Sequence, residues 1–409
     1  MFRCIYSLGE FEKSNGEHIL QNFLGARWVS TELVSDELQA EFGRTIDAAL
    51  EKRLKIVRNL LGTLGGRGGD GPTLKHLSAT TGEHLDLEPG GHPRLSRPAM
   101  QEKKLPSGQI RVSAQVANRQ QFDWMLAEVR RRHPNAEINL EQAVDSARLS
   151  EGFIEGYVPF QIDIGGNDYF RGALKACFNL LGATHPEIAI KTCFAPVREF
   201  IKDGNGTAER FVRWVVSSDQ LDVPQLGPGD QAIFIVTRDQ SVEGVLQFFG
   251  QILHSFQLTD SYDGPSIQCG YIVDPFREAS RSETRNPAFK PSSIPVFKDQ
   301  SSVYSTAVQT GWETRLSRIL DLYYSRSRSR MIEKTIAEVV QDHPGDVFTR
   351  EMIEQIAQKL AQRFMRLPTQ LKKKSSKVGL HSTVFSRVSN SQIRRVAHAS
   401  ALFTCPSRN

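Results

Sequence analysis

Residues 232–237, with the sequence AIFIVT, constrain the fold of this chain most, because apolar residues follow one another there without interruption. A continuous apolar run of this length is typical of a buried strand. Strand and helix patterns both occur between residues 110 and 300, which predicts an α+β body. Strands are expected at 110–116, 242–258 and 268–273, and helices at 120–132, 170–181, 187–189 and 197–201.

The N-terminal segment, residues 1–61, is predicted to be ordered and to hold two helices. Its second helix is indicated by an apolar stripe at three- and four-residue steps that ends at Gly62. Ser30 is a suitable N-cap for the first helix, over 31–42, and Gly43 is a suitable stop. Short strands are expected at 2–6 and 18–20. The stripe consists of Ile46, Leu50, Leu54, Val57 and Leu61.

Composition separates three further regions. Residues 62–109 are rich in glycine and proline, which predicts a mostly irregular connector. They lack the motif G-x-x-x-x-G-K-[ST], so the glycines are interpreted as turn residues rather than a phosphate-binding loop. Residues 301–370 have helical patterns at 312–324 and 331–340, with Thr349 as the N-cap of a third helix. Residues 371–409 are basic, rich in serine and without periodicity, which predicts a disordered tail.

Charge is distributed unevenly along the 409 residues, whose formal net charge is +5. Residues 301–409 hold 18 Lys+Arg and 8 Asp+Glu, so the rest of the chain is mildly acidic. A basic region of this kind can bind nucleic acid through phosphates, or it can be a solubilising tail. The cluster Lys372, Lys373 and Lys374 and the Ser-Arg alternation at 324–330 are candidate phosphate contacts, with a solvated face as the alternative.

The remaining composition favours a cytoplasmic protein. No stretch of about 18 apolar residues occurs, so no membrane span is predicted. The N-terminus lacks the apolar region of a secretory signal. Five scattered cysteines without a C-x-x-C pair argue against a disulfide framework.

The stretch from Cys4 to Asp47 carries the most specific motif. It contains, in order, Cys4-Ile5-Tyr6, Glu17-His18-Ile19, Leu24-Gly25-Ala26-Arg27, Phe42-Gly43 and Ile46-Asp47. The order, spacing and identities resemble the HNH endonucleases. Within them, the stretch is similar to a group with the pattern C-I-Y-C, E-H-I, L-G-[GA]-[RK] and C-x-x-C-[NQ]-x-x-F-G-x-x-I-D.

The resemblance implies a ββα-metal finger that hydrolyses phosphodiester bonds, with DNA favoured over RNA as the substrate. His18 would be the general base, while Glu17 and Gln39 would hold a single divalent ion, Mg²⁺ or Mn²⁺. Arg27 would contact a phosphate, and its alternative is a free surface arginine. Proteins of this kind often serve in bacterial defence or in mobile elements. The expected architecture is therefore an HNH-like finger, a larger mixed α+β body and a helical, basic C-terminal region.

The sequence departs from the family pattern at the cysteines that hold a structural zinc. Only Cys4 remains, and the other three positions fall on Ser7, Ser35 and Leu38, so no structural zinc is expected. The asparagine that organises the loop in the family is replaced by Glu32. Two alternatives follow. The chain is a degenerate, non-catalytic HNH-like protein that binds nucleic acid, or it is an interaction protein whose α+β body carries the function.

Overall fold

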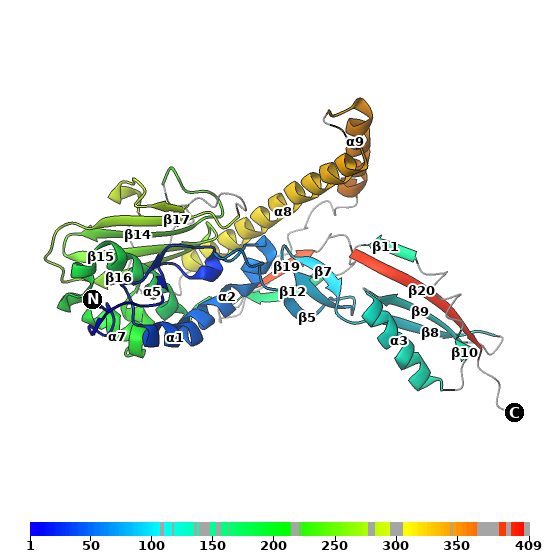
Figure 1. Cartoon of the computed structure of the whole chain (residues 1–409), viewed down its shortest axis with the longest axis horizontal. Coiled ribbons are helices and arrows are strands. Elements are labelled where there is room, and N and C mark those ends of the chain that lie inside the picture. The colour runs from blue at the N-terminus through cyan, green and yellow to red at the C-terminus, as the bar shows by residue number, and fades with distance from the viewer. Residues whose placement is uncertain are drawn as a thin grey trace. The chain divides into compact units, whose positions relative to one another are not determined.

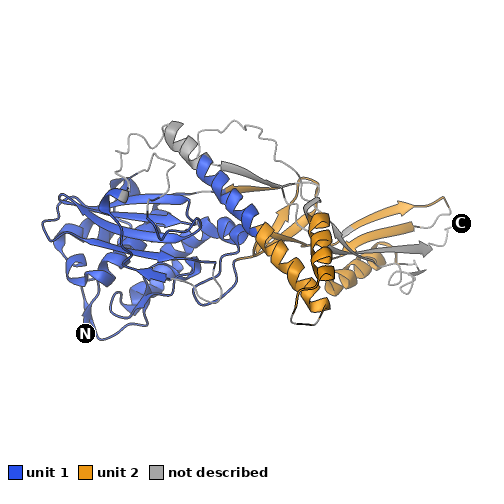
Figure 2. Cartoon of the chain, turned by 90° about the horizontal axis from the view of Figure 1, so that it is seen from above, with its two compact units in different colours: residues 1–71, 162–326, 378–384 blue, residues 72–161, 327–377, 385–409 orange. Residues whose placement is uncertain are grey.

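The structure is a computed structural model of the chain. It describes residues 1–106, 110–116, 118–134, 137–138, 148–152, 157–162, 164–213, 221, 223–276, 283–294, 306–343, 345, 347–365, 384–389 and 394–404. The chain divides into two compact units (Figure 2). Unit 1 consists of Met1–Gly71, Ile162–Arg326 and Val378–Val384, and unit 2 of Pro72–Gln161, Ser327–Lys377 and Phe385–Asn409.

Unit 1 contains the N-terminal segment and most of the predicted body (Figure 1). Its strands are β1 (Phe2–Arg3), β2 (Glu10–Phe11), β3 (Glu17–His18), β4 (Val29–Ser30), β13 (Val212–Arg213), β14 (Gln231–Arg238), β15 (Ser241–Phe248), β16 (Ile252–Thr259), β17 (Gln268–Val273) and β18 (Glu283–Arg285). Its helices are α1 (Asp36–Arg44), α2 (Ile46–Leu61), α5 (Asn167–Thr184), α6 (Pro186–Ala189) and α7 (Ala195–Asp203), with 3₁₀ turns at Asn22–Leu24, Thr192–Phe194, Ala208–Arg210 and Pro291–Ser293.

Unit 2 contains shorter sheets and two helices of its own. Its strands are β5 (Leu74–Ser78), β6 (His84–Glu88), β7 (His92–Leu95), β8 (Ala99–Lys104), β9 (Ile110–Val116), β10 (Glu137–Ile138), β11 (Arg148–Gly152), β12 (Tyr157–Ile162), β19 (Val384–Ser389) and β20 (Arg394–Thr404). Its helices are α3 (Arg119–Arg132) and α9 (Arg350–Met365), while α8 (Thr306–Asp342) contributes residues to both units.

The main sheet of unit 1 has six antiparallel strands in the order β13-β16-β15-β14-β17-β18. Alternate residues of β14, such as Phe234, belong to a core cluster with Phe289 and Ile294. Helix α5 packs against the other face, where Cys177 lies against Gly244 of β15 (Figure 1). Because β14 is buried on both faces, its sequence is a continuous apolar run rather than an alternating one.

Helix α5 is the central element of unit 1, because α2 packs on it opposite the sheet. Gly172 of α5 approaches Ile46 and Leu50 of α2 closely, and the apolar stripe of α2 is buried. Most of α5 is therefore apolar, and Lys175 and Asn179 are buried with the rest of it. These two polar side chains are one helical turn apart and point to the same face.

The second sheet of unit 2 has the strand order β10-β20-β9-β8, with β11 also paired to β20. Helix α3 packs on one face, where Val112 and Ala114 of β9 join Met125 and Val129 of α3 in a core cluster. Residues alternate between the faces of a strand, so Arg111 and Ser113 face away from α3. One face of this sheet is thus apolar and covered by α3, and the other face carries Arg111 and Ser113 of β9.

The structure confirms the mixed α+β class predicted from the sequence. The buried strand β14 and the striped helix α2 occur where the patterns placed them, and Gly62 ends α2 in the left-handed conformation. Helix α3, predicted at 120–132, begins one residue earlier and ends at the predicted residue. None of the helices in the described residues is long and apolar enough to span a membrane.

Several elements differ from the predictions. Residues 62–109 contain β5 to β8 rather than a mostly irregular connector. The reason is that Leu85, Leu87 and Leu95 are buried on strands that pair with one another. Helix α1 begins after Ser35 instead of Ser30, and it continues through Gly43. The two helices expected at 312–324 and 331–340 form the single helix α8. Strands β19 and β20 lie in the tail for which disorder is predicted.

The compact units also cut across the predicted domain boundaries. Residues 110–161 of the expected α+β body belong to unit 2, whereas its remainder packs with the N-terminal segment in unit 1. The reason is that α2 and α5 share a buried interface, which no local pattern reveals.

Candidate functional site

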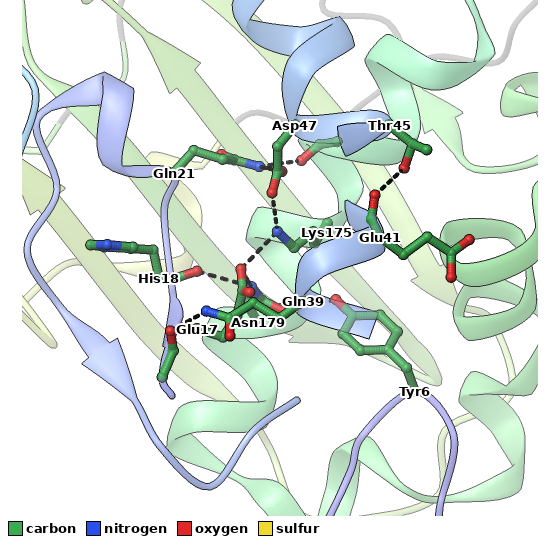
Figure 3. A network of polar contacts seen from close by, with 12 residues as sticks. Tyr6, Glu17, His18, Gln21, Gln39, Glu41, Thr45, Asp47, Lys175 and Asn179 are labelled. Atoms are coloured by element: carbon green, nitrogen blue, oxygen red, sulfur yellow. Dashed lines mark hydrogen bonds and ion pairs between the residues drawn. The ribbon is translucent and has the colours of Figure 1, made fainter. Parts of the chain in front are cut away.

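A buried lysine joins the N-terminal segment to α5. Lys175 Nζ lies 2.7 Å from Glu17 Oε1 and 2.6 Å from Asp47 Oδ2 (Figure 3). The Lys175 side chain is 1% exposed, and the side chains of Glu17 and Asp47 are 6% and 20% exposed. The separations are those of charge-assisted hydrogen bonds. We call these three residues the lysine triad.

Neutral side chains complete the surroundings of the triad. Asn179 Nδ2 donates to the His18 carbonyl at 3.0 Å and to Glu17 Oε1 at 3.4 Å, and the Tyr6 hydroxyl donates to Asn179 Oδ1 at 2.7 Å. Gln21 Nε2 donates to Asp47 Oδ1 and to the Gly172 carbonyl, each at 2.9 Å. The triad is thus fixed from β3, α2 and α5 together.

The triad holds two carboxylates and one ammonium, so it carries one net negative charge when all three groups are ionised. Burial lowers the pKa of Lys175, but Asp47 and Glu17 outweigh it, so the pKa is raised. Burial raises the pKa of Glu17, and Lys175 opposes that effect without cancelling it. Lys175 is therefore a cation at neutral pH, and at Glu17 the effect of burial exceeds that of the neighbouring ammonium.

The ring of His18 extends away from Lys175 (Figure 3). Its Nδ1 and Nε2 are buried and have no hydrogen-bond partner in the described part of the chain. Burial lowers the pKa of His18 to about 4, with a further contribution from Arg67. The imidazole is therefore neutral at pH 7. Glu17 and His18 adjoin in the sequence, but the structure does not bring their functional atoms to one centre.

The other two predicted site residues make contacts within the chain. The side-chain amide nitrogen of Gln39 donates to the carbonyl of Gly16, which ties α1 to the turn before β3. Arg27 Nε donates to the Gly66 carbonyl at 3.0 Å, and the Arg27 backbone N–H donates to the Glu283 carboxylate. Lys372, Lys373 and Lys374 lie outside the described residues.

The residues of the predicted metal site do not fit a divalent ion. The carboxylate of Glu17 is held by an ammonium, and Gln39 presents its nitrogen to a carbonyl. Across the described ranges, no group of three or more His, Cys, Asp and Glu side chains is placed to hold a metal. At the four positions where the HNH pattern has cysteine, Cys4, Ser35 and Leu38 of this chain are buried and Ser7 is exposed.

Sequence reasoning missed Lys175 and Asn179, and it missed the ion pair between Asp47 and Lys175. Asp47 is interpretable as a helix-terminal carboxylate from the sequence alone. The sequence does contain a signal for Lys175 and Asn179. Lys175 and Asn179 are polar residues at a four-residue spacing inside an otherwise apolar helix, and such residues need a partner when the helix is buried.

A second candidate surface lies on the sheet of unit 2, on the face opposite α3. Lys103 of β8 and Arg111 of β9 are direct cross-strand partners, and both are exposed. Neither has an ion-pair partner among the residues that the structure describes. Like charges directly opposite on paired strands are destabilising, so this pair lowers stability unless an anion binds it.

Comparisons of this chain with protein families, with curated proteins and with solved structures find no match.

Proposed function

We propose that this protein binds nucleic acid through unit 2 and that its HNH-like N-terminal segment is a scaffold rather than a nuclease centre. The observation that carries the proposal is the exposed cross-strand pair Lys103 and Arg111, two cations that face the same side without a protein anion between them. Phosphates of a nucleic acid backbone would relieve their repulsion and release counterions.

The distribution of charge between the units supports this proposal. Unit 2 holds 26 Lys+Arg and 17 Asp+Glu, whereas unit 1 holds 25 and 29. The charge that attracts phosphates is therefore concentrated in the unit that carries the pair. Lys372, Lys373 and Lys374 belong to the same unit by sequence and would add to the attraction.

The scaffold role is supported by the lysine triad. An HNH-type nuclease needs its acidic ligand free to hold a metal ion beside the scissile phosphate. Here the ligand position, Glu17, is neutralised by Lys175, and the ring of His18 lies away from that pair. The strand–strand–helix order of β3, β4 and α1 is compatible with an HNH-like origin of the segment.

A metal-dependent DNA endonuclease is the second candidate, favoured by one observation. Both ring nitrogens of His18 are buried without a hydrogen-bond partner in the described residues, and a general base needs a nitrogen that no protein group occupies. This candidate requires Glu17 to leave Lys175 when the ion and DNA bind. It predicts DNA cleavage that depends on Mg²⁺ or Mn²⁺ and on His18.

The test of the first candidate is the affinity of the full chain for fluorescently labelled DNA, measured by anisotropy over a range of salt concentrations. We expect the Lys103→Gln/Arg111→Gln variant to bind about tenfold more weakly and to reduce the slope of log K against log salt by about 2. The matched control is Lys52→Gln/Lys55→Gln, which removes two exposed lysines of α2 in unit 1. Equal affinities of the two variants, or wild-type protein that does not bind DNA, would contradict the proposal.

A further inference from the structure

We propose that Lys175 is a built-in cation that takes the place of a metal ion between Glu17 and Asp47. It would make the folding of the N-terminal segment onto α5 independent of divalent ions. The inference concerns the architecture of unit 1 and holds whether or not the chain binds nucleic acid.

The geometry at Lys175 is that of one cation shared by two carboxylate oxygens. Nζ lies 2.7 Å from Glu17 Oε1 and 2.6 Å from Asp47 Oδ2, and the contacts come from β3 and α2. Hard divalent ions are bound in the same way, by carboxylates from separate elements around one centre, at somewhat shorter distances. The lysine therefore performs the joining role that a metal ion would otherwise have.

A buried amide oxygen supplies a second observation. Gln21 is 5% exposed, and its Nε2 donates to two acceptors, Asp47 Oδ1 and the Gly172 carbonyl, which fixes the orientation of the amide. Its Oε1 is consequently left buried with no hydrogen-bond partner in the described residues. A half-turn of the amide would exchange this oxygen with the nitrogen that now faces Asp47.

The charge balance points in the same direction. With Lys175 the two carboxylates retain one net negative charge, and without its ammonium they would carry two in a buried place. Such a place either takes up protons or binds a cation. The oxygens of the two carboxylates are ligands that Mg²⁺ and Mn²⁺ prefer. Removal of the ammonium is therefore expected to convert the triad into a site for a divalent ion.

The decisive experiment is Mn²⁺ binding to the full chain, followed by the loss of the free Mn²⁺ signal in electron paramagnetic resonance. Four proteins are compared: wild type, Lys175→Ala, Lys175→Ala/Glu17→Gln and Lys52→Ala as the matched surface control. We expect Lys175→Ala to bind one additional Mn²⁺ per chain with a Kd of about 10⁻⁴ M, as at weak oxygen-ligand sites. The double variant should lose that ion, and the surface control should behave as wild type.

Thermal unfolding supplies the companion measurement, because Lys175→Ala can be too unstable to fold without an ion. MnCl₂ should then restore its cooperative transition, while EDTA should leave the Tm of the wild type unchanged. The proposal is overturned by a folded Lys175→Ala that binds no additional Mn²⁺, or by an unfolded one that Mn²⁺ does not rescue. It is equally overturned by a wild type that binds as many Mn²⁺ ions as Lys175→Ala does.

Discussion

Glu17 and His18 are consecutive residues of strand β3, yet their side chains lie in different surroundings. The carboxylate of Glu17 is buried against Lys175, and the ring of His18 extends away from it (Figure 3). Side chains alternate across a strand, so adjacent residues do not share a face. The two functional groups therefore have different neighbours in this structure.

The lysine triad makes a strong prediction about stability. Replacing Lys175 by methionine leaves Glu17 and Asp47 buried without a cation, and removal of one partner from a buried ion pair costs about 3–5 kcal/mol. We expect Lys175→Met to lower the free energy of unfolding by that amount in urea titrations. Lys52→Met, at an exposed position of α2, should change it by less than about 0.5 kcal/mol. Similar values for the two variants would contradict the structural role of Lys175.

Gly66 connects the glycine-rich stretch to the N-terminal segment by close backbone packing. A Cβ atom at Gly66 would lie 1.9 Å from the Ala26 carbonyl oxygen, whereas one at Gly69 would meet nothing within 4 Å. Gly66→Ala should therefore destabilise unit 1 by about 1–3 kcal/mol, as overpacking does. Gly69→Ala is the matched control and should be nearly neutral. A Tm for Gly66→Ala equal to that of the control would show that the loop does not pack in this way.

A buried histidine on the main sheet should make the free energy of unfolding depend on pH. His254 of β16 is hydrogen-bonded to the Tyr169 hydroxyl at 2.6 Å. Burial, assisted by Arg315, lowers the pKa of His254 from 6.5 to about 3. The folded state therefore disfavours the proton that the unfolded state accepts. The contribution of neutral His254 to the free energy of unfolding is complete above pH 6.5 and declines as the pH falls toward 3.

Between pH 6.5 and about 3, the free energy of unfolding should fall by about 1.4 kcal/mol for each pH unit because of His254. It can be measured from urea titrations between pH 4 and pH 7. His254→Gln removes the titrating group while keeping a side chain that can hydrogen-bond to Tyr169, so its stability should fall less steeply with pH. If the variant and the wild type have the same slope, other groups control the acid sensitivity.

The local patterns of the sequence predict much of unit 1, because each is satisfied within one element. The stripe of α2 and the apolar run of β14 need only a core on the correct side. The three-stranded sheet β5-β6-β7 was not predictable in the same way. The many glycines around that sheet indicate turns. The alternation of Leu85 and Leu87 indicates a strand, but this signal is weaker than that of the glycines.

The candidate site is less predictable, because its contacts are distant along the chain. The resemblance implies a ββα finger around Glu17 and His18, and the structure pairs the two-residue strands β3 and β4 there without testing that resemblance. The partner of Glu17 is on α5, and Lys175 and Asp47 are 128 residues apart. No local pattern encodes that pairing. It arises only when α2 and α5 pack together, and it replaces the expected metal ligands by an ion pair.

The measurement that tests the central claim most directly is an assay that follows both the binding and the cleavage of nucleic acid by the same protein. Purified full-length protein is incubated with supercoiled plasmid, linear duplex, single-stranded DNA and RNA, in Mg²⁺, Mn²⁺ or EDTA, beside His18→Ala prepared identically. The account predicts that DNA is bound and stays intact in every condition, with binding insensitive to EDTA. Cleavage that requires the metal and disappears in His18→Ala would contradict it, because Lys175 would then have to release Glu17 during catalysis.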